Sequence, residues 1–173
     1  DSLNTEINSI KEKVKSNQKA NNIIFLLDIS NSMNAEDVSP NRLELAKNIM
    51  IGTVKNLEND KIGIVVFAGK AHTILPLTND LTIADTYIES IQTGIAKTQG
   101  TDFLSAMEEA ANRLQAVPKN SRKIVLLTDA EDNEGDESEA IKIAQREGIT
   151  IFTVPLGTEE GAPIPEYVYG QLL

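Results

Sequence analysis

The stretch 22–32 constrains the fold of this chain more than any other part of the sequence. Residues 23–27 form an apolar run with the length of a strand, and polar residues bound it on both sides. Such a run is typical of a central strand that is covered on both faces. The run ends at Asp28, and Ser30 and Ser32 follow at alternate positions. Because the loop after such a strand leaves the carboxyl end of the sheet, where open α/β folds bind their ligands, these three side chains predict a site for a hard cation.

Composition narrows the class of protein and the class of ligand. The 173 residues suit a single domain with its own core. The formal net charge of −10 disfavours nucleic-acid binding and leaves divalent cations and basic partners open. The sequence contains no cysteine, which excludes disulfides, thiolate metal sites and a cysteine nucleophile. No apolar run is long enough to span a bilayer, and the sequence opens on Asp1 without a visible signal peptide, so we expect a domain excised from a longer protein.

Further apolar runs predict strands, and residues with helical periodicity fill the segments between them. Strands are expected at 62–67, 71–77, 123–128, 149–154 and 167–169. Helices are expected at 40–58, 83–91, 104–114 and 136–148. Ser39 is the expected N-cap of the first of these helices, Pro76 places its strand at an edge, and Gly148 is the expected C-cap of the last helix. Strands alternating with helices predict an α/β fold: a doubly wound, Rossmann-like, mostly parallel sheet with one antiparallel edge strand and helices on both faces.

The first 21 residues are polar and allow two interpretations. Ile7, Ile10 and Val14 fall at helical spacing, whereas 11–15 also fits an edge strand that leads into a turn. A linker followed by a lead-in strand is the preferred interpretation. The predicted organisation is a lead-in segment at 1–21, one domain at 22–165 and a tail at 166–173.

Oxygen-bearing side chains are predicted to meet where two strands end. Asp28 and Asp129 each follow an apolar strand, and a loop delivers Thr101 at the start of a helix. Together with Ser30 and Ser32 they form an all-oxygen donor set, which suits Mg²⁺, Mn²⁺ or Ca²⁺ rather than Zn²⁺ or Cu²⁺. Two carboxylates leave such a cation some electrophilicity, so it favours one further anionic oxygen, supplied by a Glu or Asp of another protein.

These residues resemble the metal-ion-dependent adhesion site (MIDAS) of a von Willebrand factor type A (VWA) domain. That motif is written Asp-x-Ser-x-Ser, followed by a distant Thr and a distant Asp, and the sequence offers DISNS at 28–32, GTD at 100–102 and LLTDAED from 126. One departure is Ala130, where the family commonly has Gly. The longer stretches DISNSMNAEDVSPNRLELAK, IGIVVFAGKAHTILPLTND and GTEEGAPIPE resemble the Bat group of bacterial aerotolerance-operon membrane proteins, closest to its A and B members.

The resemblance implies a metal-dependent protein–protein interaction module and not an enzyme. The implied ligands are the hydroxyls of Ser30, Ser32 and Thr101, with Asp28 and Asp129 binding directly or through water. The resemblance also implies a domain held in the bacterial inner membrane by flanking helices and exposed to the periplasm. Its implied partners are sister Bat proteins and a MoxR-type AAA+ ATPase, with no role for nucleic acid.

Two other classes of function fit the sequence less well than a binding module does. A metal-assisted phosphoryl-transfer or hydrolytic enzyme would use Asp28 as nucleophile, but no Lys or His occupies a clear motif position beside the acids. A nucleotide-binding Rossmann domain lacks its G-x-G-x-x-G loop. Of the remaining candidates, Asp102 is expected to complement a helix dipole, His72 to be a surface or packing residue, and Met33 to face a partner.

Overall fold

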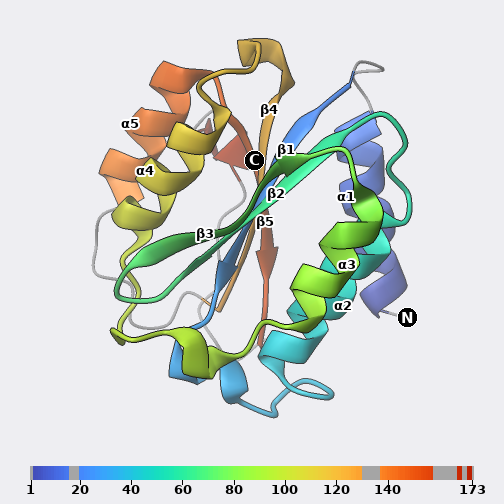
Figure 1. Cartoon of the computed structure of the whole chain (residues 1–173). Helices are drawn as coiled ribbons and strands as arrows, with labels where there is room; N and C mark the ends of the chain where they lie inside the picture. Colours follow the sequence, from blue (N-terminus) through green and yellow to red (C-terminus); the bar gives the residue numbers. More distant parts are fainter. Residues whose placement is uncertain (1, 16–19, 130–136, 158–166, 169–170, 173) are drawn as a thin grey trace.

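A five-stranded sheet forms the centre of the protein. The computed structural model describes residues 2–15, 20–129, 137–157, 167–168 and 171–172. The strand order is β3-β2-β1-β4-β5 (Figure 1). The strands are β1 (Asn22–Asp28), β2 (Lys61–Phe67), β3 (Ala71–Thr78), β4 (Arg122–Thr128) and β5 (Thr150–Pro155). Only β3 runs antiparallel to its neighbour, which confirms the predicted mostly parallel sheet with one antiparallel edge strand.

Helices cover both faces of this sheet (Figure 1). One layer contains α1 (Ser2–Lys15), α2 (Arg42–Val54) and α3 (Leu81–Glu89), and the other contains α4 (Phe103–Leu114) and α5 (Glu137–Glu147). The described connections contain the short 3₁₀ helices η1 (Asn31–Asn34), η2 (Thr93–Ile95) and η3 (Lys119–Ser121). Near the C-terminus, β6 (Tyr167–Val168) pairs with β7 (Gln171–Leu172).

Strand β1 divides the core into two clusters. Ile23, Phe25 and Leu27 belong to the cluster under α1, α2 and α3, whereas Ile24 and Leu26 belong to the cluster under α4 and α5. All five side chains are completely buried. The unbroken apolar run therefore results from burial on both faces, as expected for a central strand of a doubly wound sheet.

The N-terminal segment is a helix, so the preferred interpretation of a linker and a lead-in strand is wrong. The helical spacing of its apolar residues was the correct signal. Ile10 is 3% exposed and joins the core under α2. The contact between the two helices is close, since a Cβ at Gly52 of α2 would overlap the side chain of Ile7. Tertiary packing therefore decides the conformation of a segment whose polar composition leaves it ambiguous.

Helix ends differ from the prediction at one important place. The N-cap of α2 is Asn41 rather than Ser39, because the Asn41 side chain accepts a hydrogen bond of 2.8 Å from the Glu44 N–H. Asp102 caps α4 through the Ser105 N–H at 2.9 Å, which confirms its predicted structural role at a helix N-terminus. Gly148 ends α5 with φ of 67°, as a C-cap glycine does.

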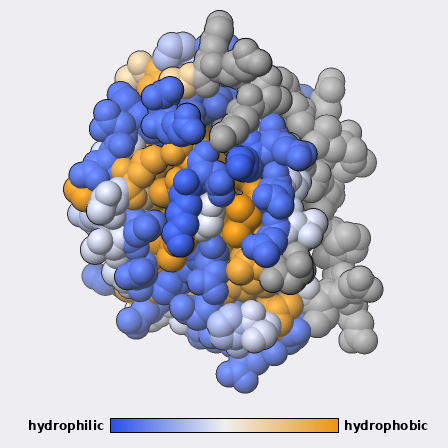
Figure 2. All heavy atoms as spheres, turned by 90° about the vertical axis from the view of Figure 1, so that its right-hand side faces the viewer, coloured by the Kyte–Doolittle hydropathy of each residue, from blue (hydrophilic) through white to orange (hydrophobic). Residues whose placement is uncertain are grey.

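Helix α3 buries fewer of its apolar residues than its periodicity indicates. Ala84 and Ile88 are completely buried, whereas Ile83 is 42% and Tyr87 40% exposed. The side of the molecule that carries α1, α2 and α3 is mostly hydrophilic, with hydrophobic patches between the hydrophilic residues (Figure 2). Among the described residues, no helix combines the length and apolar character needed to cross a membrane.

Candidate metal centre

The two predicted acids lie at the same edge of the sheet. Asp28 is the last residue of β1, and Asp129 follows the last residue of β4. These strands are parallel neighbours in a register that pairs Leu27 with Leu127. The two strands therefore end side by side, and the negative charge of Asp129 raises the pKa of the Asp28 carboxyl. The strand covers residues 22–28, so Asp28 is its last residue, whereas the sequence predicted that Asp28 directly follows the strand.

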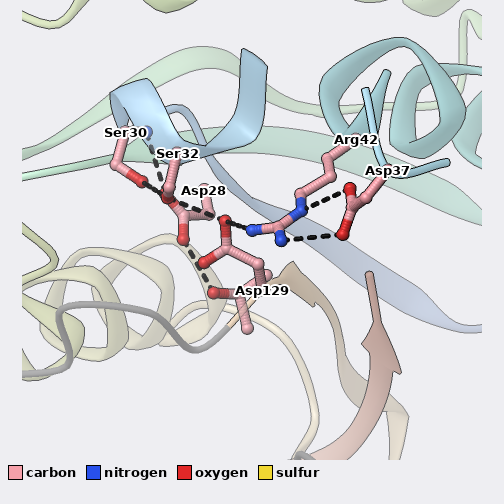
Figure 3. A network of polar contacts seen from close by, with 7 residues as sticks. Asp28, Ser30, Ser32, Asp37, Arg42 and Asp129 are labelled. Atoms are coloured by element: carbon pink, nitrogen blue, oxygen red, sulfur yellow. Dashed lines mark hydrogen bonds and ion pairs between the residues drawn. The ribbon is translucent and has the colours of Figure 1, made fainter. Parts of the chain in front are cut away.

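Hydrogen bonds connect the serines of the loop after β1 to both acids (Figure 3). The Ser30 N–H donates to Oδ1 of Asp28 at 2.9 Å. The hydroxyls of Ser30 and Ser32 are 3.0 Å apart, and the Ser32 hydroxyl donates to Oδ2 of Asp129 at 2.7 Å. The structure thus brings four of the five predicted ligands into one polar network. Their role as metal ligands stays a prediction.

Thr101 reaches the same edge from the other side of β1. It is 3% exposed and precedes Asp102, whose N–H donates to the Ala68 carbonyl at 2.8 Å. Ala68 directly follows β2, the parallel neighbour of β1, so its position places the loop at the carboxyl end of the sheet. Ala130, the departure from the motif, lies outside the described residues.

Burial controls the acidity of Asp28. This residue is completely buried, and desolvation raises the pKa of its carboxyl from 3.8 to about 6. Hydrogen bonds from Ser30 and from the Thr128 hydroxyl, which donates at 2.7 Å, lower the pKa, while the charge of Asp129 raises it further. These hydrogen-bond donors are neutral. A cation placed against Asp28 would therefore relieve a real electrostatic cost.

Arg42 is a member of this network that the sequence reasoning missed. Its Nη1 donates to Oδ2 of Asp129 at 2.9 Å, and its Nε and Nη2 donate to the two carboxylate oxygens of Asp37 at 2.9 and 2.8 Å (Figure 3). A signal was present in the sequence. A positive charge at the first position of a helix opposes the helix dipole, so such a residue needs acidic partners nearby.

Met33 is not available to a partner, contrary to the prediction. It is completely buried and belongs to the core under α2, because η1 turns its side chain inward. The neighbouring Asn34 instead faces the rim, where its side chain and the Thr93 hydroxyl exchange hydrogen bonds of 2.9 and 3.1 Å. His72 is exposed on the edge strand β3, in agreement with a surface role.

The donor set fits a small, hard divalent cation. All its members offer oxygen, and the described residues contain no group of three or more His, Cys, Asp or Glu placed to hold a metal. Neighbouring ligands of an octahedral Mg²⁺ at about 2.1 Å lie about 3.0 Å from each other. The hydroxyls of Ser30 and Ser32 have that separation, which a direct hydrogen bond between them would also give. Hydroxyls and carboxylates at this spacing suit Mg²⁺ or Mn²⁺ better than a soft metal.

Comparison with protein families gives one match that covers most of the chain. A family model described as the von Willebrand factor type A domain matches residues 23–131. The matched segment contains β2, β3, β4 and all but the first residue of β1, but not β5, and it includes every predicted metal ligand.

Two similar solved structures come from Bacteroides. The conserved hypothetical protein BatB from Bacteroides thetaiotaomicron is 42% identical, with a TM-score of 0.78, and the match covers 84% of this chain and 71% of that chain. An aerotolerance-related membrane protein from Bacteroides fragilis NCTC 9343, solved with multiple mutations to serines, is also 42% identical. Its TM-score is 0.75, and the match covers 84% of this chain and 72% of that chain.

A more distant structure shares the fold. Proximal thread matrix protein 1 from the mussel byssus, solved with a zinc-occupied MIDAS motif, is 24% identical with a TM-score of 0.65. The match covers 79% of this chain and 35% of that one. Among curated relatives the chain spans less than half of the proteins it matches, 41% of one and 46% of another.

Proposed function

The chain belongs to the von Willebrand factor type A domain family, and we propose that it is a divalent-metal-dependent protein–protein interaction module. The proposed ligands are Asp28, Ser30, Ser32, Thr101 and Asp129, with Mg²⁺ as the expected cation and Mn²⁺ or Ca²⁺ as alternatives. When bound, the cation would supply an open coordination position for an acidic side chain of the partner. The mussel protein with zinc at its MIDAS motif supports metal binding as a capacity of this fold.

The convergence of Asp28, Ser32 and Asp129 is the observation that carries this proposal. Two buried carboxylates and a partly buried hydroxyl from remote segments lie in one network, and burying the two carboxylates is costly unless a positive charge balances them. Arg42 balances Asp129, and within the described part of the chain the hydrogen-bond donors to Asp28 are neutral. Asp28, Asp37 and Asp129 together carry three negative charges, which Arg42 and a divalent cation would balance, so an anionic partner group would be held by coordination to the cation.

The cellular setting is proposed from the resemblance to the Bat group. The two Bacteroides structures, one described as an aerotolerance-related membrane protein, support a role in an aerotolerance or stress-related assembly. We propose that the domain is anchored in the bacterial inner membrane and faces the periplasm. Sister Bat proteins and a MoxR-type AAA+ ATPase are the proposed partners.

An enzyme that uses Asp28 as nucleophile is the weaker alternative. The carboxyl of Asp28 is completely buried and is not exposed to solvent, as a nucleophile that attacks a substrate would be. Arg42 is a cationic group near the acids, but Asp37 and Asp129 already engage it. Steady hydrolysis of nucleoside triphosphates or phosphoesters that disappears in Asp28→Asn would favour the enzyme instead.

Calorimetric titration with Mg²⁺ and Mn²⁺ tests the proposed site. We expect Asp28→Asn and Ser30→Ala to lose measurable binding, because each removes a ligand atom, whereas Ser90→Ala at the end of α3 serves as a matched control that keeps it. Affinity capture of the full-length protein should then yield a partner in Mg²⁺ and lose it in chelator. A wild-type protein without millimolar divalent affinity, or a partner retained equally in chelator, would refute the proposal.

A further inference from the structure

Two charged residues outside the proposed ligand set are connected to one of its members, one directly and the other through the first. Oδ2 of Asp129 accepts a hydrogen bond from Nη1 of Arg42 at 2.9 Å. On the other side of the guanidinium, both carboxylate oxygens of Asp37 accept hydrogen bonds, from Nε at 2.9 Å and from Nη2 at 2.8 Å (Figure 3). The three side chains therefore form a line from an exposed loop to a buried carboxylate.

We propose that Arg42 is a positioning residue for Asp129 and that Asp37 holds Arg42 in this role. The relay formed by Asp37, Arg42 and Asp129 then sets the divalent-cation affinity of the site. The inference rests on the proposed function, since it assigns a task to residues around the same cation. It names two residues that touch neither cation nor partner and act through Asp129.

Burial fixes the members of the relay in one geometry. The side chain of Asp129 is 1% exposed and that of Arg42 is 11% exposed. The guanidinium also lies against the loop after β5, where a Cβ at Gly157 would be 3.4 Å from its Cζ, Nε and Nη2. A planar group packed in this way has few alternative rotamers, so its hydrogen bond holds one oxygen of Asp129 in place and orients the other.

Charge and geometry make opposite predictions for Arg42. As a positive charge beside the site, it repels an incoming cation, so its removal would strengthen binding. As a fork that holds Asp129, it supports binding, so its loss would weaken it. Arg42→Lys separates the two effects, because a lysine keeps the charge but lacks the planar fork that engages Asp37 and Asp129 together.

The experiment is a Mn²⁺ titration of the protein by calorimetry, with the electron paramagnetic resonance of bound Mn²⁺ as a second measurement. We expect Arg42→Lys to weaken binding about tenfold, as is typical when a residue that orients a metal ligand is lost. Asp37→Asn should weaken it several-fold, while Glu36→Gln, which removes the same charge from the adjacent exposed residue, should leave it unchanged. The resonance of bound Mn²⁺ should change in the first two variants and not in the control.

A double variant decides whether Asp37 acts through Arg42. In the Arg42→Lys background, Asp37→Asn should cause no further loss, because the relay is already broken. Three outcomes would overturn this inference and leave the proposed function standing. They are additive losses in the double variant, equal effects of Asp37→Asn and Glu36→Gln, and an unchanged Mn²⁺ affinity in Arg42→Lys. A wild-type protein that binds no Mn²⁺ would overturn this inference and the proposed function together. If Arg42→Lys does not fold, the comparison of Asp37→Asn with Glu36→Gln still decides the outcome.

Discussion

The hydroxyl of Ser32 donates a hydrogen bond of 2.7 Å to Oδ2 of Asp129, which lies 97 positions away in the sequence. This contact joins the loop after β1 to the end of β4 and places a hydroxyl beside a carboxylate at the proposed metal site. It also leaves the Ser32 oxygen 3.0 Å from that of Ser30. Two hydroxyls and a carboxylate therefore share one small volume, although neither strand alone supplies them.

Loss of this hydroxyl should weaken metal binding more than it weakens the fold. We expect Ser32→Ala to lower the Mn²⁺ affinity at least tenfold, because it removes a ligand atom and the hydrogen bond that orients Asp129. The free energy of unfolding in chelator should fall by only about 1 kcal/mol, the usual net worth of one hydrogen bond. Calorimetry and urea unfolding measure the two effects, and a larger loss of stability than of affinity would contradict the assignment.

The stability of the metal-free protein should depend on pH through Asp28. Its pKa is raised from 3.8 to about 6, so the folded state holds this proton more tightly than the unfolded chain does. The resulting stabilisation is complete below about pH 4 and is lost as the pH rises through about 6, an effect on the order of 3 kcal/mol. Urea unfolding in chelator should show the loss in wild type relative to Asp28→Asn. Parallel pH profiles of the two proteins would argue against a raised pKa.

Protons and metal should compete for the same carboxyl. Because Asp28 binds a proton below about pH 6, we expect the Mn²⁺ affinity of the wild type to fall as the pH drops from 7 to 5. Calorimetry in buffers of different ionisation enthalpy should detect the release of a proton near pH 5.5. An affinity that stays constant over this range would show that Asp28 does not bind the cation.

Helix α1 should contribute to the stability of the domain, although the family match begins only at residue 23. We expect Ile10→Ala to cost about 2–4 kcal/mol, because the side chain is 3% exposed and its loss leaves a cavity. The control is Ile83→Ala, whose side chain is 42% exposed and whose truncation should cost less than about 0.5 kcal/mol. Equal midpoints of urea unfolding for both variants would place α1 outside the cooperative unit.

Gly63 should tolerate no side chain. A Cβ at this position of β2 would lie 2.8 Å from Cδ1 of Ile24 and 2.9 Å from the Leu75 carbonyl oxygen, at a place where the register with β3 shifts. We expect Gly63→Ala to destabilise the protein by about 1–3 kcal/mol, because the backbone of β3 must move. Gly94→Ala is the matched control, since nothing lies within 4 Å of its Cβ. Thermal unfolding compares them, and similar melting temperatures would refute the close approach.

Several features of the site could be predicted from local sequence. The apolar run before Asp28 specified a central strand, since only a strand buried on both faces has no polar alternation. The strand before Asp129 gave the same signal, and parallel neighbours bring their carboxyl ends together. The predicted place of Asp102 at a helix N-terminus was also correct, because a helix start is set by local sequence, although the prediction was a charge that complements the dipole and the structure shows a side-chain cap.

Other features were decided only by tertiary contacts. The sequence shows a positive charge near the start of a helix at Arg42, but only the folded structure shows that Asp37 and Asp129 are the acids that bind it. Met33 was predicted to face a partner, but η1 turns it into the core. The sequence alone determined which segments are strands and where the acids follow them, because a strand that is buried on both faces appears in the sequence as a continuous apolar run. Only the folded structure decided which charges meet, because an ion pair between distant residues leaves no periodic trace in the sequence.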